Sequence, residues 1–510
     1  MNTDNGATTS VWMQTADVPR GGRLDGDAEA DVVIVGAGIA GMTTAYLLAQ
    51  EGKRVVVLDD GPVAGGETCR TTAHLTNALD DRFHVLERHF GERGARLAAE
   101  SHTAAIDKIE EIAREENIDC DFTRLDGYLF VPPGESTEQL GEELRAAHRA
   151  GLHDVEYVER VPYDAYDFGQ ALRFPRQGQF HVLKYIDGLT RAFTRAGGRV
   201  FTGTHADEIK SLDEQNVRVK TSDGFTVSAR AAVVATNTPV NDLVAIHTKQ
   251  APYRTYVIGA RVPKGSVPQI LLWDTPDPYH YIRIQPVEDH DVLIVGGEDH
   301  KTGQADDMDE RYRRLEEWTR ERFPMIESIE FRWSGQVMEP VDGMAFIGRN
   351  PSDNENVFIA TGDSGNGMTH GTIAGVLLTD LIMNRQNPWA EIYDPSRTPL
   401  DAPLEYAKEN LNVAAQYTDL ATPGDISSAE EVPAGEGAIL RRGLTKVAVY
   451  RDESGTLFER SAICAHLGCV VRWNPGEKSW DCPCHGSRYD PVDGHVVNGP
   501  AIKGLAEASE

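Results

Sequence analysis

Short runs of β-branched residues alternate with helical segments at the start of the chain. Residues 31–35 predict a buried strand, residues 42–50 a helix, and residues 54–58 a second strand. A strand, a helix and a strand in this order form a βαβ unit, which places the two strands in parallel. A later run, residues 357–360, is followed by a helix predicted over residues 373–383. The pattern therefore predicts an α/β core.

The middle of the chain interrupts this core with a different pattern. Residues 82–116 are rich in charge and place apolar side chains at helical spacing, which predicts a long helix. Strand-like runs recur at residues 127–131, 253–261, 279–285 and 291–296. We therefore expect a second, sheet-rich part interleaved with the segments of the α/β core.

The character of the chain changes after residue 393. Residues 395–435 are rich in Pro, Ala, Glu and Asp and lack a strong period, which indicates a linker or a wrapping segment. From about residue 415 to the end, short strand-like runs and turns predict a small all-β domain. No stretch approaches the roughly 18 consecutive apolar residues of a membrane span, so we expect no transmembrane helix.

Composition narrows the partners and the compartment. The net charge of −30 argues against nucleic acid and against an anionic membrane surface, because both attract basic proteins. The first residues are polar and lack the layout of a secretory signal, so we expect a cytoplasmic protein. Four of the six cysteines lie in the last 50 residues. In a cytoplasmic chain, such a cluster favours metal binding over a framework of disulfides.

A glycine-rich turn follows the first predicted strand. Residues 36–41 (GAGIAG) fit the pattern G-x-G-x-x-G between a strand and a helix. Gly36 permits the tight turn, Gly38 lets the backbone approach a pyrophosphate, and Gly41 lets the helix pack closely on the strand. The start of the helix offers N–H donors and a positive dipole end to the phosphates. Because Asp59 ends the second strand, where it can bind a ribose, the context favours a dinucleotide site over a structural turn.

A second glycine-rich segment closes the core. Residues 360–368 (ATGDSGNGM) follow a predicted strand, open a helix and can direct backbone N–H groups at a flavin. No second G-x-G-x-x-G follows a strand, which argues against a built-in NAD(P)H domain. Together with residues 233–237, 339–343 and 347–349, the two turns resemble the D-amino-acid oxidase-like flavoproteins, which include glycine and sarcosine oxidases.

The resemblance covers residues 28–395 and implies FAD as the cofactor. It implies an α/β Rossmann-like FAD-binding domain with an interleaved sheet-rich substrate domain of the α+β type, followed by the small all-β domain. The expected ranges are residues 28–80, 180–240 and 335–395 for FAD, 81–179 and 241–334 for substrate, 396–414 for a linker and 415–510 for the last domain. The expected FAD-binding residues are Gly36, Gly38, Ile39, Ala40, Gly41, Asp59, Asp60, Gly66, Thr71, Thr72, Thr236, Gly362, Asp363, Gly365, Gly367 and Met368.

The resemblance also implies a reaction, the oxidation of a C–N bond in an amine or amino acid, with FAD carrying the chemistry. A substrate carboxylate would need a cationic partner, and Arg283 shares a predicted strand face with Tyr281. The alternative makes Arg283 a surface residue and Tyr281 a core residue. His74 follows the cofactor segment and is a candidate to face the flavin, with a structural histidine as the alternative. These three are the candidate catalytic residues.

Cysteines and histidines crowd into two short segments near the end, CAHLGC and CPCHGS. Cys464, His466, Cys482 and His485 supply two thiolates and two imidazoles. Such a set suits zinc, and it also suits a Rieske [2Fe–2S] centre, in which the cysteines hold one iron and the histidines the other. The spacing C-x-H followed after 15 residues by C-x-x-H closely resembles a Rieske domain. The resemblance implies a [2Fe–2S] cluster on these four residues.

The Rieske resemblance is to the proteins of cytochrome bc complexes. Cys469 and Cys484 match the cysteines that form a disulfide between the two cluster loops in that family. Ser487 and Tyr489 match the residues that hydrogen-bond a bridging sulfide and a ligand sulfur, which raises the reduction potential. Residues 499–501 resemble the proline loop that covers the cluster. Without the membrane anchor of that family, we expect a high-potential centre that needs no membrane partner.

Two further sets of residues give weaker indications of function. Asp81, His84 and His89 fit the spacing of a non-haem iron site, as in a Rieske oxygenase. In the Rieske oxygenases the Rieske domain precedes the iron site, and here the order is reversed. We therefore reject this iron site and keep the oxygenase only as an alternative. Cys69 is expected to be a small buried residue rather than a redox thiol or a covalent attachment point for FAD.

The leading functional prediction is a dehydrogenase. FAD takes two electrons from an amine or amino acid and passes them singly to the Rieske cluster, which gives them to an external acceptor, either a protein or a quinone. An oxidase that uses O₂, with a structural or regulatory cluster, is the second hypothesis. A non-catalytic redox sensor or electron carrier is the third, and the expected substrate domain argues against it. A homo-oligomer is compatible with the sequence, so transfer within one chain and transfer between chains both stay open.

Overall fold

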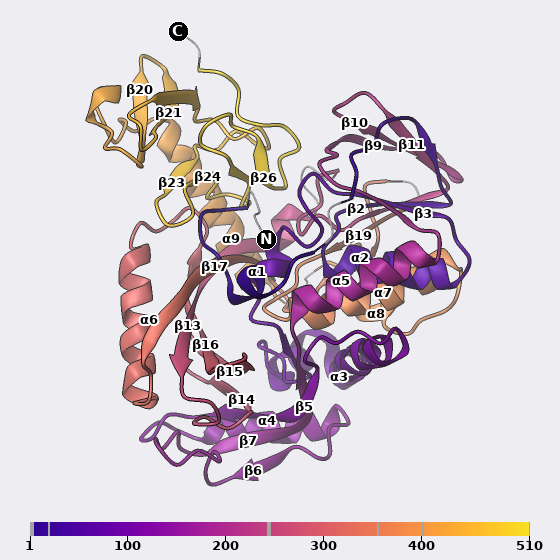
Figure 1. Ribbon diagram of the computed structural model, residues 1–510, viewed down its shortest axis with the longest axis vertical. Coiled ribbons are helices and arrows are strands. Elements are labelled where there is room, and N and C mark those ends of the chain that lie inside the picture. The colour runs from indigo at the N-terminus through magenta and orange to yellow at the C-terminus, as the bar shows by residue number, and fades with distance from the viewer. Residues whose placement is uncertain (1–4, 19–20, 242–245, 354–355, 399–401, 509–510) are drawn as a thin grey trace.

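Three parts of the protein meet around a segment from the N-terminus (Figure 1). A computed structural model describes residues 5–18, 21–241, 246–353, 356–398 and 402–508. Figure 1 shows an α/β domain at the right, a large-sheet domain at the left and bottom, and a C-terminal domain, in orange and yellow, at the top.

The α/β domain is built on a six-stranded sheet with the order β18–β19–β12–β2–β3–β8. Neighbouring strands run parallel, except that β18 is antiparallel to β19. The strands are β2 Val32–Val35, β3 Val55–Leu58, β8 Arg199–Phe201, β12 Ala231–Val234, β18 Phe346–Arg349 and β19 Val357–Thr361. Its helices are α2 Ile39–Gln50, α5 Val182–Arg195, α7 Gly367–Ile382 and α8 Ala390–Tyr393. Strands β2, β3 and β12 are buried along their whole length, as expected for a parallel sheet covered on both faces.

The predicted βαβ unit is present as β2, α2 and β3, with Val32 opposite Val55. Helix α7 packs closely on α2, because a Cβ on Gly375 would lie only 2.4 Å from Cγ2 of Thr43. A smaller four-stranded sheet with the order β1–β11–β10–β9 adjoins this domain. Its strands are β1 Ala28–Glu29, β9 Ala206–Asp213, β10 Asn216–Thr221 and β11 Thr226–Ala229.

Among the described residues, the large-sheet domain has nine strands, eight of them in the order β17–β13–β16–β15–β14–β5–β7–β4, with β6 paired to β7. They are β4 His74–Leu75, β5 Thr123–Phe130, β6 Glu156–Val158, β7 Ala171–Gln179, β13 Gln250–Val262, β14 Leu271–Asp274, β15 Tyr281–Pro286, β16 Asp291–Lys301 and β17 Ser328–Pro340. The helices are α3 Phe83–Glu115, α4 Glu138–Arg149 and α6 Met308–Arg322, and α3 is interrupted at Gly91. Within the described part of the chain, no helix combines the length and apolar character that crossing a membrane requires.

Two strands of the large sheet extend into ranges that the sequence assigned to FAD. Strand β4 lies within residues 28–80, and the end of β17 lies within residues 335–395. Strand β4 pairs with β7, and β17 pairs with β13. These two strands therefore belong to the sheet while they lead into the cofactor-binding segments.

The C-terminal domain is all β, as predicted, and contains two small sheets. The strands are β20 Gly437–Arg442, β21 Thr445–Arg451 and β22 Leu457–Ser461 in one sheet, and β23 Arg472–Asn474, β24 Ser479–Asp481, β25 Arg488–Tyr489 and β26 Val496–Asn498 in the other. Each sheet pairs its strands in chain order and antiparallel.

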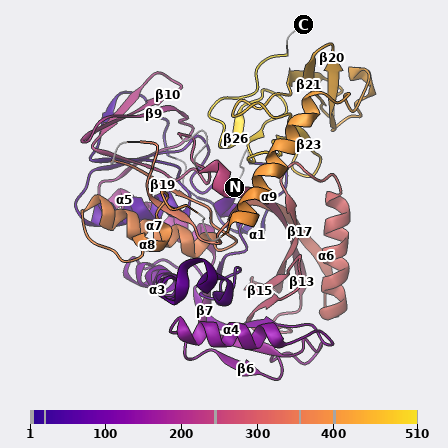
Figure 2. The ribbon, with the colours of Figure 1, turned by 180° about the vertical axis from the view of Figure 1, so that it is seen from behind.

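A helix occupies the segment for which the sequence predicts a linker. Helix α9 Pro403–Gln416 runs from the centre of the molecule up to the C-terminal domain (Figure 2). Proline in its first turn needs no backbone donor, which suits a helix start. Lys301 forms an ion pair with Glu409, and Gln304 Nε2 donates to Asn412 Oδ1 at 2.7 Å. These contacts attach α9 to the large-sheet domain.

Residues 5–18, which we call the N-terminal arm, lie between the three parts (Figure 1). Helix α1 Val11–Thr15 buries Trp12, whose Nε1 donates to the carbonyl of Thr71 at 2.6 Å. The backbone N of Thr8 donates to the carboxylate of Glu477 at 3.2 Å. The arm therefore connects the cofactor-binding segment of the α/β domain to the C-terminal domain.

Candidate functional site

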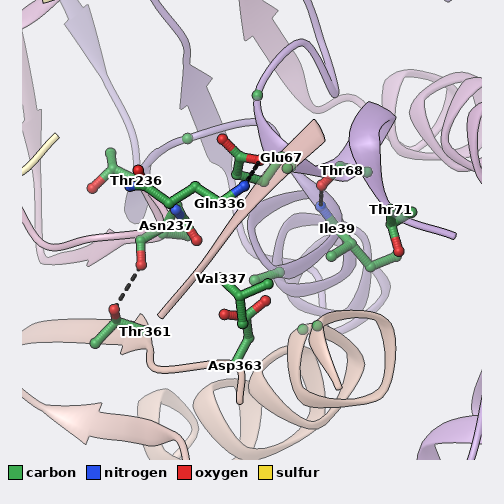
Figure 3. A pocket seen from close by; sticks show the side chains of 18 of the residues that line it. Ile39, Glu67, Thr68, Thr71, Thr236, Asn237, Gln336, Val337, Thr361 and Asp363 are labelled. Atoms are coloured by element: carbon green, nitrogen blue, oxygen red, sulfur yellow. Dashed lines mark hydrogen bonds between the residues drawn. The ribbon is translucent and has the colours of Figure 1, made fainter. Parts of the chain in front are cut away.

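A cavity of about 290 Å³ lies where the three parts meet. Its lining combines the glycine-rich loops of the α/β domain, strands of the large sheet and residues 496–499 and 501–502 of the C-terminal domain. Figure 3 shows part of this lining, with Ile39 and Thr68 on one side, Thr236 on the other and Gln336 between them. The cavity therefore brings together residues that are far apart in the sequence.

The glycine-rich turn between β2 and α2 forms one wall of the cavity. A Cβ on Gly36 would lie 2.4 Å from the backbone oxygen that follows β12, and one on Gly41 would lie 1.9 Å from the Gly36 oxygen. The backbone N of Ile39 donates to Thr68 Oγ1 at 3.1 Å, which fixes the start of α2 (Figure 3). Because this helix start lines the cavity, its positive end is available to a phosphate.

The residues predicted to bind FAD gather around this cavity. The exception is Gly41, which allows the close packing of α2 instead. The residues in the lining are Gly36, Gly38, Ile39, Ala40, Asp59, Asp60, Gly66, Thr71, Thr72, Thr236, Gly362, Asp363, Gly365, Gly367 and Met368. The carboxylate of Asp59 accepts hydrogen bonds from the backbone N of Ala37 at 2.6 Å and of Gly61 at 2.9 Å, so it joins two cofactor loops. The cavity wall contains glycines whose missing side chains leave room for a ligand. Together with the start of α2 and the carboxylate of Asp59, this wall fits FAD.

A junction around Glu67 was missed by the sequence reasoning. Its carboxylate accepts hydrogen bonds from the backbone N of Gln336 at 2.7 Å, from Asn498 Nδ2 at 2.8 Å and from Asn5 Nδ2 at 3.2 Å. These residues come from four separate segments, so no local pattern connects them. The one available signal was the position of Glu67 next to Gly66.

The three candidate catalytic residues have different placements. His74 and Tyr281 line the cavity, with ring centroids 5.8 Å apart. Burial and the nearby Arg283 lower the pKa of His74 to about 3, so its ring is neutral. Arg283 is fully buried and is not part of the lining; it donates to three backbone carbonyls and to Gln285 Oε1. This placement argues against the predicted role of Arg283 in binding a substrate carboxylate.

The residues of the rejected non-haem iron site and the thiol of Cys69 have structural roles. His84 Nδ1 lies 2.8 Å from a carboxylate oxygen of Glu143, and Asp81 accepts a hydrogen bond from Ser364. Among the described residues, Asp81, His84 and His89 do not form a group that could share one metal ion. Cys69 is buried, as predicted, and burial raises the pKa of its thiol to about 12.

The two predicted cluster loops come together in the C-terminal domain. The Cys482 thiol, together with the Tyr489 hydroxyl, holds the pKa of Cys464 below its usual value. The rings of His466 and His485 are perpendicular, with centroids 5.0 Å apart. Nδ1 of His485 is buried and has no hydrogen-bond partner among the described residues, as expected for an atom that binds a metal. Two thiols and two imidazoles in this arrangement fit a [2Fe–2S] cluster.

The residues predicted to support the cluster lie in and beside the two loops. A disulfide between Cys469 and Cys484 joins the two loops. The Tyr489 hydroxyl lies 3.0 Å from Cys464 Sγ. Ser487 Oγ accepts a hydrogen bond at 3.0 Å from a backbone N in the proline loop. The loops are therefore fixed to each other and to the segment that covers them.

Replacing Tyr489 with Phe is expected to lower the reduction potential of the cluster, because a hydrogen bond to a ligand sulfur stabilises the reduced form. A lost bond of about 1 kcal/mol corresponds to roughly 40 mV for one electron. An EPR-monitored redox titration measures the change. Tyr417→Phe is the control, since its hydroxyl donates to the Leu467 carbonyl at 2.8 Å and not to sulfur. Equal potentials in the wild type and Tyr489→Phe would contradict this role.

The cluster loops face the cavity-forming domains. The ring centroid of His247, in the segment before β13, lies 4.8 Å from that of His466 and 5.9 Å from that of His485. Gln336 lines the cavity, and its Nε2 donates to the carbonyl of Gly486 at 3.0 Å. One residue therefore reaches from the cavity wall to the loop that carries His485.

A buried network of charges holds the C-terminal domain in this place. The Glu477 carboxylate lies 3.2 Å from an Arg70 guanidinium nitrogen and 4.0 Å from one of Arg254. Asp481 lies 3.2 Å from Arg488 and 3.9 Å from Arg254. Although burial opposes ionisation, Arg70, Arg254 and Arg488 lower the pKa of Glu477 to about 2. The network crosses the interface, since Arg70 and Arg254 lie outside the C-terminal domain.

Two family models match the chain. Residues 31–381 match the model described as FAD dependent oxidoreductase. Residues 423–509 match the model described as Rieske [2Fe-2S] domain. The two matches cover the α/β and large-sheet domains and the C-terminal domain, respectively.

Individual relatives agree with the two family models. The putative Rieske 2Fe-2S iron-sulfur protein YhfW of Bacillus subtilis (strain 168) is 33% identical over 503 residues, which are 98% of this chain and 97% of the relative. The gamma-glutamylputrescine oxidoreductase of Escherichia coli (strain K12) is 26% identical over 376 residues, 70% of this chain and 85% of the relative. The crystal structure of glycine oxidase from Geobacillus kaustophilus has a TM-score of 0.61 at 20% identity, covering 73% of this chain and 99% of that one. The similarity to the glycine oxidase structure shows that the two proteins share a fold.

Proposed function

The chain belongs to the FAD-dependent oxidoreductase family and carries a Rieske [2Fe–2S] domain, and we propose that it oxidises a C–N bond of an amine or amino acid. The electrons pass from FAD to the cluster of the same chain and then to an external acceptor, a protein or a quinone. The observation that carries this proposal is the hydrogen bond from Gln336, in the cavity wall, to Gly486 in the cluster loop. The proposed location is the cytoplasm, since Cys69 and Cys120 are unpaired.

The cofactors and the chain have separate tasks in this proposal. Bound FAD would supply a hydride acceptor for the carbon attached to nitrogen, and a bound cluster would supply a one-electron acceptor. The turn at Gly36 and the start of α2 hold the phosphates of FAD. His74 has both ring nitrogens in hydrogen-bonding contact, with the Ile282 carbonyl at 3.2 Å and Thr72 Oγ1 at 3.0 Å. Its proposed task is therefore to hold the cofactor loop in place and not to transfer a proton.

An anaerobic screen of amines and amino acids with an artificial electron acceptor tests this function. Oxidation of a substrate without O₂ supports the dehydrogenase. Turnover that requires O₂ supports an oxidase with a structural or regulatory cluster. If no compound is oxidised under either condition while both cofactors are bound, a redox sensor or electron carrier becomes the better explanation.

Replacing Gln336 with Leu is expected to slow the electron transfer from FAD to the cluster severalfold, because the link to Gly486 is lost. The rate at which substrate reduces FAD is the internal reference, and the transfer to the cluster is expected to slow relative to it. Anaerobic stopped-flow absorbance measures both rates in one experiment. Gln304→Leu is a matched control, because Gln304 Nε2 also donates to a cluster-loop carbonyl, that of Pro483 at 3.0 Å, but Gln304 does not line the FAD cavity. Equal transfer rates in both variants would contradict the proposed route.

A further inference from the structure

The large-sheet side of the cavity carries acidic and aromatic groups, and from them we infer that the substrate is a cationic amine without a carboxylate, such as a diamine. Asp80 and Asp299 bind its positive charge. The inference rests on the proposed amine oxidation and names the substrate class of that same cavity. Asp80 lies against the cofactor loop, since a Cβ on Gly365 would be 2.0 Å from Asp80 Oδ2. The charge-binding pair is therefore next to the predicted FAD site.

The two carboxylates have acceptor capacity left for a ligand. Both line the cavity. Oδ1 of Asp299 is buried and has no hydrogen-bond partner among the described residues. Asp80 Oδ2 accepts one hydrogen bond, from the Tyr279 hydroxyl at 3.0 Å. A buried carboxylate without a compensating partner is costly, and the charge of a bound cation would offset that cost.

The electrostatics of the empty cavity agree with this geometry. Burial raises the pKa of Asp80 to about 6 and that of Asp299 to about 7. The neighbouring charge of Asp80 contributes to the raised pKa of Asp299. Two acids that resist ionisation in one cavity are expected to ionise more readily when a cation binds there.

Aromatic rings complete this side of the cavity. Tyr279, Tyr281 and Trp273 line it, and the centroids of the two tyrosine rings are 5.6 Å apart. Aromatic faces attract ammonium groups, most strongly where water is excluded. The His74 ring between Trp273 and Tyr281 is neutral, so it does not repel a cation.

A substrate carboxylate would find no cationic partner here. Among the described residues that line the cavity, Arg70 is the only arginine or lysine. Its Nη1 donates to Glu477, Thr8 and the Ser334 carbonyl, so the charge of this guanidinium is already paired with a carboxylate. Arg283 is committed to backbone carbonyls, as described above. An amino acid would therefore place its carboxylate against Asp80 and Asp299 without compensation.

The test compares two non-oxidisable ions on the holoenzyme, tetramethylammonium and acetate. We expect tetramethylammonium to perturb the flavin absorbance spectrum and to raise the melting temperature, and acetate to do neither. Asp299→Asn is expected to weaken tetramethylammonium binding at least about tenfold, because it removes one charge of a buried site. Asp289→Asn is the control, since it removes the same charge from an exposed turn between β15 and β16. Asp299→Glu, which keeps the charge, is expected to retain binding.

Three results would overturn the inference: acetate binding as tightly as tetramethylammonium, no binding of tetramethylammonium, or Asp299→Asn binding it as the wild type does. The comparison of the two ions needs no substitution, so a variant that fails to fold does not prevent the test. If tetramethylammonium binds as expected but no amine reduces the flavin, the cation site stands and the proposed oxidation fails. If amines reduce the flavin but the cation site is not found, only this inference fails.

Discussion

Replacing Glu477 with Gln is expected to lower the free energy of unfolding by about 3–5 kcal/mol, since it breaks a buried ion network. The substitution removes the carboxylate paired with Arg70 and weakens the charge compensation of Arg254, which keeps Asp481 at 3.9 Å; the side chains of both arginines are at most 1% exposed. Because the network crosses the interface, we also expect the C-terminal domain to separate from the cavity and the cluster to receive electrons more slowly. Calorimetry measures the stability, and stopped-flow absorbance measures the transfer.

The same carboxylate makes stability depend on pH. The pKa of Glu477 is about 2 in the folded protein, against about 4.3 in an unfolded chain. A carboxyl group with a lowered pKa stabilises the fold above its unfolded pKa, and this contribution is lost as the pH falls towards the folded pKa. The neighbouring Arg70, Arg254 and Arg488 stay charged throughout this range. The stability difference between the wild type and Glu477→Gln is therefore expected to be full at neutral pH and to shrink below about pH 4.3.

Glu459→Gln is the control for this prediction. Glu459 also lies in the C-terminal domain and pairs with Arg442 at 2.9 Å, but their side chains are 30% and 40% exposed. An exposed pair contributes about 0–1 kcal/mol, so this variant is expected to unfold almost as the wild type does. Equal stabilities of Glu477→Gln and Glu459→Gln would show that the buried network does not hold the domain.

Replacing Cys482 with Ser is expected to abolish the EPR signal of the reduced cluster, because a thiolate that holds one iron is lost. The FAD content is expected to stay near that of the wild type, since Cys482 does not line the FAD cavity. Substrate should still reduce the flavin, but transfer to the external acceptor should stop. Iron analysis, flavin absorbance and EPR measure these outcomes on one sample.

Cys120→Ser is the control for the loss of a thiol. Cys120 is buried in the large-sheet domain and is unpaired, so its loss is expected to leave the cluster signal unchanged. A Cys482→Ser variant that keeps the full signal would contradict the ligand assignment. Zinc in place of iron in the wild type would favour the structural metal site that the same four ligands also suit.

The sequence predicted those elements whose residue patterns lie within a short stretch of the chain. The run of residues 31–35, the turn at Gly36 and the helix after it fit in one short window, and β2, the turn and α2 follow the prediction. The cluster loops were predictable for the same reason, because the spacing of Cys464 and Cys482 with their histidines lies within 22 residues.

The interface between the domains was not predictable in this way. The junction at Glu67 and the network at Glu477 join segments hundreds of residues apart, and no periodicity connects them. Helix α9 was missed because Pro and acidic residues dominate its surroundings, while its contacts to Lys301 and Gln304 are tertiary. The carbonyl contacts of Arg283 were not predictable, because the alternation of a strand gives the face of a residue but not whether backbone carbonyls already occupy its donors.

The central claim is that substrate electrons pass from FAD to the cluster within one chain. Anaerobic stopped-flow reduction with a panel of diamines, other amines and amino acids tests it most directly, with flavin absorbance and freeze-quenched EPR followed together. We expect that a substrate bleaches the flavin, that a reduced Rieske signal then grows, and that the rate of its growth does not depend on protein concentration. A bleached flavin beside a cluster that stays oxidised would contradict this electron transfer and would favour an oxidase with a structural or regulatory cluster.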